Sequence, residues 1–258
     1  MTVRQVFYRM VALGAIAKTD GEYKRTVGRL LLDMRLAGEL PFGWIADNTR
    51  WMRKPRTYSS WEAALRSTAA TYRRALWADQ AAYVEIWLEK DALAGVLFEE
   101  TERWDVPLMV VKGFPSATFL YEAAEAIAAQ GKPAYLYYFG DHDPSGVAIT
   151  RHVEERLRQF APQVALHVER IAVTPAQIAT YGLPTRPTKR TDSRSKDFAG
   201  DSVEVDAIPS ATLRTLARRC IERHVDRDTL AITRTAEASE RAYLTTLAHL
   251  PREEGGQP

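Results

Sequence analysis

The sequence predicts an α/β protein with a mainly parallel sheet flanked by helices, and two observations carry this prediction. Four apolar runs, at residues 83–88, 107–111, 134–139 and 165–173, alternate with stretches of helical periodicity. Strict alternation of strands and helices is typical of βαβ units, whose crossover helices return the chain to a parallel neighbour. With 258 residues, 46% of them hydrophobic, the chain can bury the core of one large or two smaller domains.

Helices are expected between these strands and after the last one, and the other segments indicate domain boundaries. The expected helices occupy residues 91–102, 116–129, 146–160, 209–224 and 228–249. A loop rich in Pro, Ser, Thr and charged side chains covers residues 182–202. We therefore divide the chain into an N-terminal domain at 1–60, a helical linker at 61–82, a sheet domain at 83–225, and a C-terminal helix with a frayed tail at 226–258.

The N-terminal domain has the pattern of a winged helix. Apolar side chains recur at helical spacing in residues 2–13 and again in residues 21–38, where Gly14 and Gly38 are natural stops. Residues 41–54, PFGWIADNTRWMRK, favour two short strands around a turn, which would form the wing. Two helices followed by a wing form a helix-turn-helix arrangement, which commonly binds DNA.

Positive charge is concentrated in the same part of the chain. Residues 1–78 hold 14 Lys and Arg against 6 Asp and Glu, a net charge of +8, so the other 180 residues carry −6 of the total of +2. Such an excess favours a polyanionic partner, although a solvated surface gives the same pattern. The side chains expected to hold phosphates of double-stranded DNA are Lys24, Arg25, Arg29, Arg50, Arg53, Lys54, Arg56 and Lys112.

Acidic side chains follow two of the predicted strands. Glu89 follows YVEIWL, and Asp141 and Asp143 follow AYLYYF in the loop GDHDPSG. The carboxyl ends of parallel strands form the ligand-binding edge of a sheet, so these three carboxylates can converge there. They would repel one another without a cation, whereas a hard divalent ion with oxygen ligands removes the conflict. We therefore predict a Mg²⁺ site; for the loop alone, a solvated Asp-rich turn is the alternative. His142 is expected to point away.

The first helix carries a candidate nucleophile. Tyr8 lies outside the apolar stripe of this helix, and Arg4 stands one turn earlier on the same side. A guanidinium beside a phenol, whose ordinary pKa is near 10, would favour the phenolate and could also hold a phosphate. The pair is therefore suited to nucleophilic attack by Tyr8. A surface tyrosine beside a chance arginine is the alternative.

These motifs together resemble a known family. WLEKDA, followed later by FGDHDPSG, resembles the signature of the Toprim domain, a Glu after one strand and Asp-x-Asp after a later one. KGFPS at 112–116 and the Asp-Pro-x-Gly form of the second motif are similar to the topoisomerase VI A subunit. RQVFY in the first helix completes the order of parts in that subunit and in the meiotic double-strand-break transesterase. In that family the last Tyr of this motif attacks DNA, which implies this role for Tyr8 with Arg4 as its partner.

The resemblance, which covers residues 2–225, implies a function. It implies a Mg²⁺-dependent DNA transesterase that makes double-strand breaks through a 5′-phosphotyrosyl intermediate. A homodimer is implied, in which Tyr8 of one chain works with the Glu89, Asp141 and Asp143 of the other. Glu89 could instead act as general acid or base for the 3′ oxygen. The sequence contains no ATPase segment, so strand passage would require a separate ATPase B-like subunit.

Two other functions stay open. The first is a metal-dependent nuclease, similar to the Toprim subunits of plasmid-defence systems, in which water attacks and Tyr8 is idle. The second is a DNA-binding subunit of a larger complex without catalysis. The apolar runs are too short for a membrane span, and the start lacks the apolar core of a signal peptide. We therefore predict no membrane partner and a cytoplasmic, nucleoid-associated protein. The single Cys220 excludes an intrachain disulfide and fits a reducing compartment.

Overall fold

The computed structural model describes residues 1–45, 55–188, 198 and 200–249, and its contacts divide the chain into two units. Unit 1 comprises Met1–Arg50 and Ala81–His224, and unit 2 comprises Trp51–Gln80 and Val225–Pro258. Each unit therefore combines two segments that are far apart in the sequence. Within the described residues, no helix is both long enough and apolar enough to cross a membrane.

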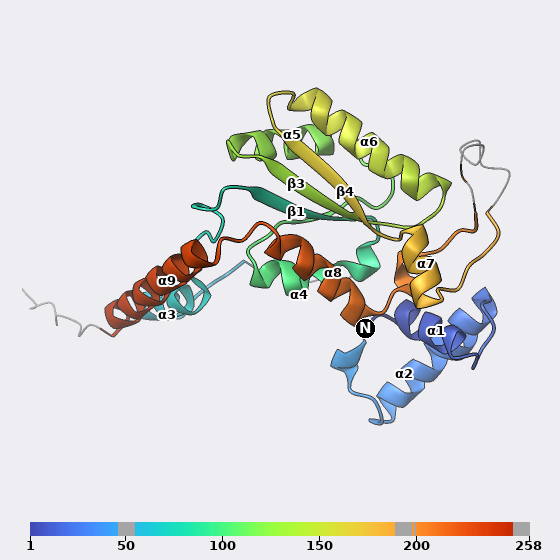
Figure 1. Cartoon of the computed structure of the whole chain (residues 1–258). Helices are drawn as coiled ribbons and strands as arrows, with labels where there is room; N and C mark the ends of the chain where they lie inside the picture. The colour runs from blue at the N-terminus through green and yellow to red at the C-terminus, as the bar shows by residue number, and fades with distance from the viewer. Residues whose placement is uncertain (46–54, 189–197, 199, 250–258) are drawn as a thin grey trace, which may run out of the picture. The chain divides into compact units, whose positions relative to one another are not determined.

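Unit 1 contains a parallel sheet, which Figure 1 shows with helices on both faces. Its described strands are β1 (Tyr83–Leu88), β2 (Leu108–Val110), β3 (Ala134–Phe139) and β4 (Leu166–Ala172), in the spatial order β2-β1-β3-β4. All pairings are parallel, which confirms the predicted sheet. Leu88 of β1 lies opposite Phe139 of β3, so the residues that follow these two central strands emerge side by side.

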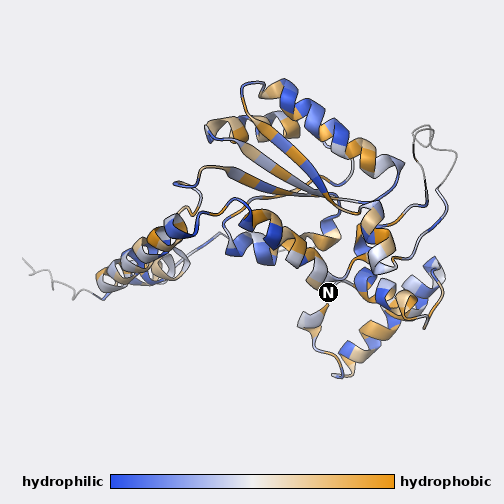
Figure 2. Cartoon of the chain, viewed as in Figure 1, coloured by the Kyte–Doolittle hydropathy of each residue, from blue (hydrophilic) through white to orange (hydrophobic). Residues whose placement is uncertain are grey.

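Helices cover the sheet because its central strands are apolar on both faces. One face is covered by α5 (Ala117–Ala129) and α6 (Pro144–Phe160), and the other by α4 (Ala94–Arg103) and α8 (Ser210–Glu222) (Figure 1). In the core, the Trp87 ring packs among buried residues that include Leu120 of α5 and Ile149 of α6. Figure 2 shows the same division, with hydrophobic residues along the strands and hydrophilic residues over much of α6.

The N-terminal part of unit 1 is helical. Helix α1 (Val3–Ala12) begins with a capping box formed by Thr2 and Gln5. A π-helical segment, η1 (Glu22–Val27), continues directly into α2 (Gly28–Leu36), which confirms the second predicted helix. The side chains that form the small core of this part are Phe7, Tyr8, Val27, Leu31 and Ile45.

The predicted wing is not shown. Residues 1–45 contain no strand, and Phe42–Trp44 form a short 3-10 helix, η2, where the first wing strand is expected. Pro41 has a φ of −59°, which suits the start of such a turn, and Ile45 is buried in the small core immediately afterwards. The rest of the expected wing, 46–54, lies outside the described residues.

Unit 2 is a pair of helices. Helix α3 (Trp61–Thr71) packs against α9 (Arg227–Leu247). The Tyr72 hydroxyl, just after α3, donates a hydrogen bond to Glu240 at 2.7 Å, and Arg241 donates to the carbonyl oxygen of Tyr72. The two helices are therefore joined by polar contacts at the end of α3.

Candidate active site at the carboxyl edge of the sheet

The loop between β3 and α6 carries Asp141 and Asp143. Asp143 is the N-cap of α6, where its carboxylate accepts a hydrogen bond from the Gly146 amide at 2.7 Å. Asp141 is buried, and its Oδ1 accepts a hydrogen bond from the Val205 amide at 2.8 Å. Local helix capping therefore fixes Asp143, whereas a contact from a distant part of the chain fixes Asp141. The ring of His142 packs against Phe198, with 4.9 Å between ring centroids.

Glu89, directly after β1, reaches the same loop. Its Oε2 accepts a hydrogen bond from the Asp141 amide at 3.0 Å. Burial raises the pKa of Glu89, and the charges of Asp141 and Asp143 contribute to a value of about 7. The structure therefore brings Glu89 to the loop that carries both aspartates, close enough for their charges to act on it.

Two glycines permit this approach. A Cβ at Gly140 would lie 2.5 Å from Glu89 Oε2, and a Cβ at Gly146 would overlap the carbonyl group of Asp141. Neither position can carry a side chain without displacing the loop or Glu89. The Asp-Pro-x-Gly motif thus requires glycine at its last position for steric reasons.

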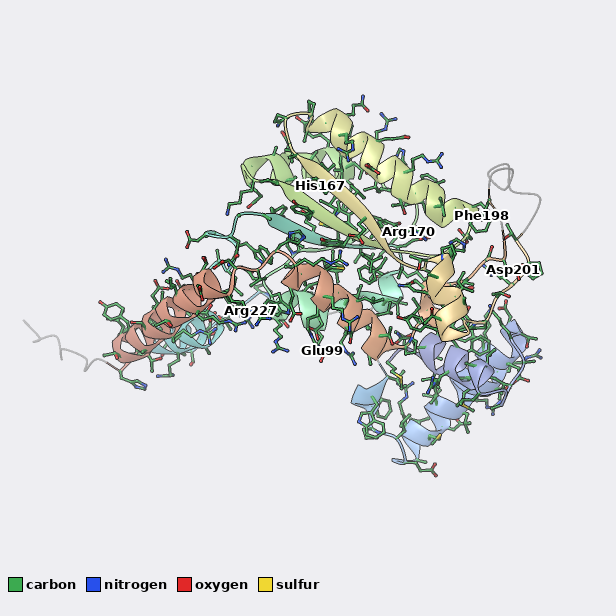
Figure 3. All side chains as sticks on the ribbon, viewed as in Figure 1. Glu99, His167, Arg170, Phe198, Asp201 and Arg227 are labelled. Carbon is green, nitrogen blue, oxygen red and sulfur yellow. The ribbon has the colours of Figure 1, made fainter. Side chains whose placement is uncertain are left out.

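Arg170 holds this loop from the neighbouring strand β4, where Figure 3 labels it. Its guanidinium donates hydrogen bonds to the carbonyl oxygens of Gly140 and Gly146 at 3.0 Å each, and to the carbonyl oxygen of Asp141. It also donates to the Thr150 hydroxyl at 2.7 Å. Sequence reasoning missed Arg170, whose one signal was a charged residue within an apolar run.

Lys90 joins the loop to the segment before α8. Its Nζ lies 2.7 Å from Asp206 Oδ2, 2.9 Å from Glu204 Oε2 and 3.2 Å from Asp141 Oδ2. Burial alone would lower the pKa of Lys90, but the three carboxylates outweigh it and raise the pKa. Glu204 and Asp206 were also missed by sequence reasoning, because no local pattern connects them with Lys90.

Tyr8 enters the same network through Glu204. The Tyr8 side chain lies close enough to the Glu204 carboxylate for this group to raise its pKa, and the side chain is buried, with 5% of its surface exposed. Arg4 lies on the same side, as predicted, but its guanidinium pairs with Glu204 at 2.9 Å. Burial and the charge of Glu204 raise the pKa of Tyr8. The prediction that Arg4 favours the phenolate is therefore wrong for this arrangement, because burial and the charge of Glu204 favour the neutral phenol.

Cations line the space beside Tyr8. A cavity of about 170 Å³, here called the tyrosine cavity, is lined by Arg4, Tyr8, Lys18, Arg186 and Glu204, among others. The Lys18 Nζ lies 5.3 Å from the centre of the Tyr8 ring, and Arg186 pairs with Glu204 at 3.3 Å. Arg186 also lines a cavity that borders Asp143. Positive side chains therefore extend from Tyr8 towards the acidic loop.

The predicted DNA-binding side chains are spread over several segments. Lys24, Arg25, Arg29 and Arg56 are exposed, as such a role requires. Lys112 pairs with Asp91 at 2.9 Å. The remaining three, Arg50, Arg53 and Lys54, lie outside the described residues.

The acidic residues have the oxygen donors that a hard cation prefers, but their positions do not form a ready metal site. Among the described side chains, no three of Asp, Glu, His or Cys are gathered as a metal site. Asp141 faces Lys90 and the Val205 amide instead. The donors are nevertheless carboxylate oxygens, and after burial the charges of Asp141 and Asp143 contribute to the raised pKa of Glu89. A cation would offset these charges.

Comparison with known proteins gives a partial match. A family model described as "Protein of unknown function C-terminus (DUF2399)" matches residues 61–163. No curated protein matches the chain. The matched segment contains Glu89, Asp141 and Asp143, whereas Tyr8 precedes it. Over this segment the chain is similar to that family, whose description assigns no activity.

Proposed function

We propose that the protein is a Mg²⁺-dependent DNA transesterase in which Tyr8 attacks a backbone phosphate. One observation carries the proposal: Tyr8, Glu204, Lys90 and Asp141 form a continuous polar network within one unit. This network joins a candidate nucleophile to a carboxylate at the edge of the sheet. The parallel sheet with acidic residues after β1 and β3 also supports a Toprim-like domain. A winged helix before it is part of the proposal.

The tyrosine cavity suits a phosphate. Arg4, Lys18 and Arg186 can donate hydrogen bonds to its non-bridging oxygens. In the free protein, Arg4 and Arg186 pair with Glu204, so an entering phosphate competes with Glu204 for both guanidinium groups. Loss of these partners makes Glu204 a stronger base, and the Tyr8 side chain lies beside it.

The reaction then follows in one displacement. The Tyr8 oxygen bonds to phosphorus while the bond from phosphorus to the 3′ oxygen breaks, and the phenolic proton passes to Glu204. Mg²⁺ held by Glu89, Asp141 and Asp143 would supply positive charge for the phosphate and the leaving oxygen. Glu89 could instead give the 3′ oxygen its proton, since a pKa of about 7 leaves it part protonated near neutral pH.

A homodimer that cuts both strands belongs to the same proposal. The network links Tyr8 to Asp141 of its own chain, which supports a cut made within one chain as an alternative to the expected pairing of Tyr8 with the partner's carboxylates. A dimer would place two such sites on one duplex.

The test is a covalent-adduct assay. Protein, end-labelled duplex DNA and Mg²⁺ are incubated, denatured with detergent, and analysed for DNA that migrates with protein. We expect an adduct in the wild type, its loss in Tyr8→Phe, and its retention in Tyr121→Phe, which changes an exposed tyrosine of α5. Strand breaks with free ends, undiminished in Tyr8→Phe, would contradict transesterification.

Hydrolysis by water is the second candidate, and two observations favour it. The pKa of Tyr8 is raised, which opposes formation of a phenolate. The family match includes the three acidic residues but not Tyr8. A nuclease predicts metal-dependent cutting that Glu89→Gln abolishes and Tyr8→Phe leaves unchanged, so the same assay separates the two functions.

A further inference from the structure

A larger cavity also borders Tyr8. It measures about 620 Å³ and is lined by residues of α1, by the turn after α7 (Pro175–Tyr181) and by the segment from Asp206 to Thr212 at the start of α8. We call it the α8 cavity. Its volume falls within the range of roughly 300–1,000 Å³ that is usual for small-molecule sites. The proposed reaction uses none of its residues except Tyr8.

Three buried polar side chains that line the α8 cavity hold an atom without a hydrogen-bond partner. The atoms are Gln5 Nε2, Asp206 Oδ1 and Ser210 Oγ, in residues that are 4%, 1% and 6% exposed. A buried polar atom without a partner costs about 1–3 kcal/mol, so three in one place require an explanation. Together they offer an N–H donor, a carboxylate acceptor and a hydroxyl that can do either. The α8 cavity is thus equipped for a ligand that both donates and accepts.

The same cavity has an anion-binding side. Helix α8 has 13 residues and no side-chain cap, because Pro209 occupies the N-cap position. Its first turn therefore presents uncapped N–H groups and the positive end of the helix dipole. Arg9 and Arg214 also line the α8 cavity; Arg214 pairs with Glu99 at 3.2 Å, whereas Arg9 forms no ion pair with the residues that the structure describes. These groups favour a phosphate.

We propose that the α8 cavity binds a nucleoside monophosphate unit, with its phosphate at the first turn of α8. The base would occupy the apolar part, where Gln5 and Asp206 can hydrogen-bond to its edge. The nucleoside monophosphate can belong to a DNA strand or be a free nucleotide, and the cavity would recognise both by the same contacts. The first case rests on the proposed function, because Tyr8 lines both cavities and the bound nucleotide would be a neighbour of the attacked phosphate.

Fluorescence titration with 2-aminopurine deoxyriboside 5′-monophosphate tests the proposal without metal or cleavage. We expect saturable binding to the wild type, and at least tenfold weaker binding of the nucleoside without phosphate. A short single-stranded oligonucleotide that displaces the probe identifies a DNA strand as the source. Displacement by mononucleotides alone identifies the free nucleotide. Either result supports the shared chemistry.

Two variants probe the two ends of the site. Ser210→Ala and Arg9→Gln should each weaken probe binding at least fivefold, whereas Ser239→Ala and Arg151→Gln, at exposed helical positions, should not. Ser210→Ala should leave the melting temperature of the free protein unchanged or higher, because it removes an unpaired buried hydroxyl. A purely structural Ser210 would instead lower it.

Three results overturn the proposal. In the first, the nucleoside binds as tightly as the nucleotide. In the second, inorganic phosphate displaces the probe at the concentration needed for a mononucleotide. In the third, Ser210→Ala and Arg9→Gln both bind the probe as the wild type does. The last would mean that water alone satisfies the unpaired atoms. Nucleotide binding and the covalent adduct are measured separately, so either can fail while the other stands.

Discussion

The pKa of Glu89 is set by burial and by the two aspartates beside it, and it has a consequence for stability. The pKa is about 7 in the folded protein against an ordinary value of 4.5, so ionisation of Glu89 opposes folding. Its contribution to stability is fully present below pH 4.5 and is lost as the pH rises through 7. Acidic conditions thus relieve the crowding that a metal ion would otherwise relieve.

Glu89→Gln should therefore stabilise the metal-free protein at alkaline pH only. We expect the free energy of unfolding in a chelator to exceed that of the wild type by about 2 kcal/mol at pH 8 and to equal it at pH 4.5. Denaturant titration at both pH values measures this, with Glu154→Gln on the surface of α6 as control. A variant that is less stable than the wild type at pH 8 would show that charge crowding does not act on Glu89.

Arg4 and Tyr8 show what local spacing can and cannot predict. Helical periodicity placed them on one side of α1, and both line the tyrosine cavity. It also placed Tyr8 outside the apolar stripe, yet the ring is buried and belongs to the small core. Burial first, and then Glu204 from a distant part of the sequence, reverse the expected shift in the pKa of Tyr8, and Glu204 also pairs with Arg4. Spacing within α1 could not predict a contact with a residue so distant in the sequence.

At the scale of elements, the sheet was predictable because its strands are buried. β1 and β3 match the predicted residues 83–88 and 134–139, since a strand covered on both faces must be a continuous apolar run. Helix α7 was missed, although Thr174 and Gln177 form a capping box at its start. The first strand of the expected wing is not seen, because Phe42–Trp44 form a 3-10 helix that alternation alone does not reveal, and 46–54 lie outside the described residues.

The β3–α6 loop depends on one side chain of β4. Arg170→Lys should destabilise the protein by about 2–4 kcal/mol, because an ammonium cannot reproduce the fork of hydrogen bonds to Gly140, Gly146 and Thr150. Thermal unfolding measures the loss, and amide hydrogen exchange should show it first in the loop. Arg158→Lys, at an exposed ion pair on α6, should change little. Equal stability of the two variants would mean that the hydrogen bonds from Arg170 do not stabilise the loop.

At the scale of the whole molecule, each unit is made from separated segments. The alternation of strands and helices that builds the parallel sheet was visible in the sequence, but the pairing of α3 with α9 had no local signal. Contacts such as Tyr72 to Glu240 join residues that only the folded chain brings together. A pattern of apolar residues predicts that a helix has a buried face and does not identify the partner that covers it.

Unit 2 should therefore lose protection independently of the sheet. Glu240 accepts the hydrogen bond of Tyr72 at 2.7 Å and pairs with Arg74 at 2.5 Å, so Glu240→Ala removes two contacts between the end of α3 and α9. We expect faster amide hydrogen exchange in both helices and unchanged exchange in β1 and β3, because the helices and the sheet belong to different compact units. Glu154→Ala, which removes one exposed ion pair on α6, is the matched control. Exchange that rises equally in β1 and β3 would mean that the two units open as one, and the division of the chain into two stability units would then be wrong.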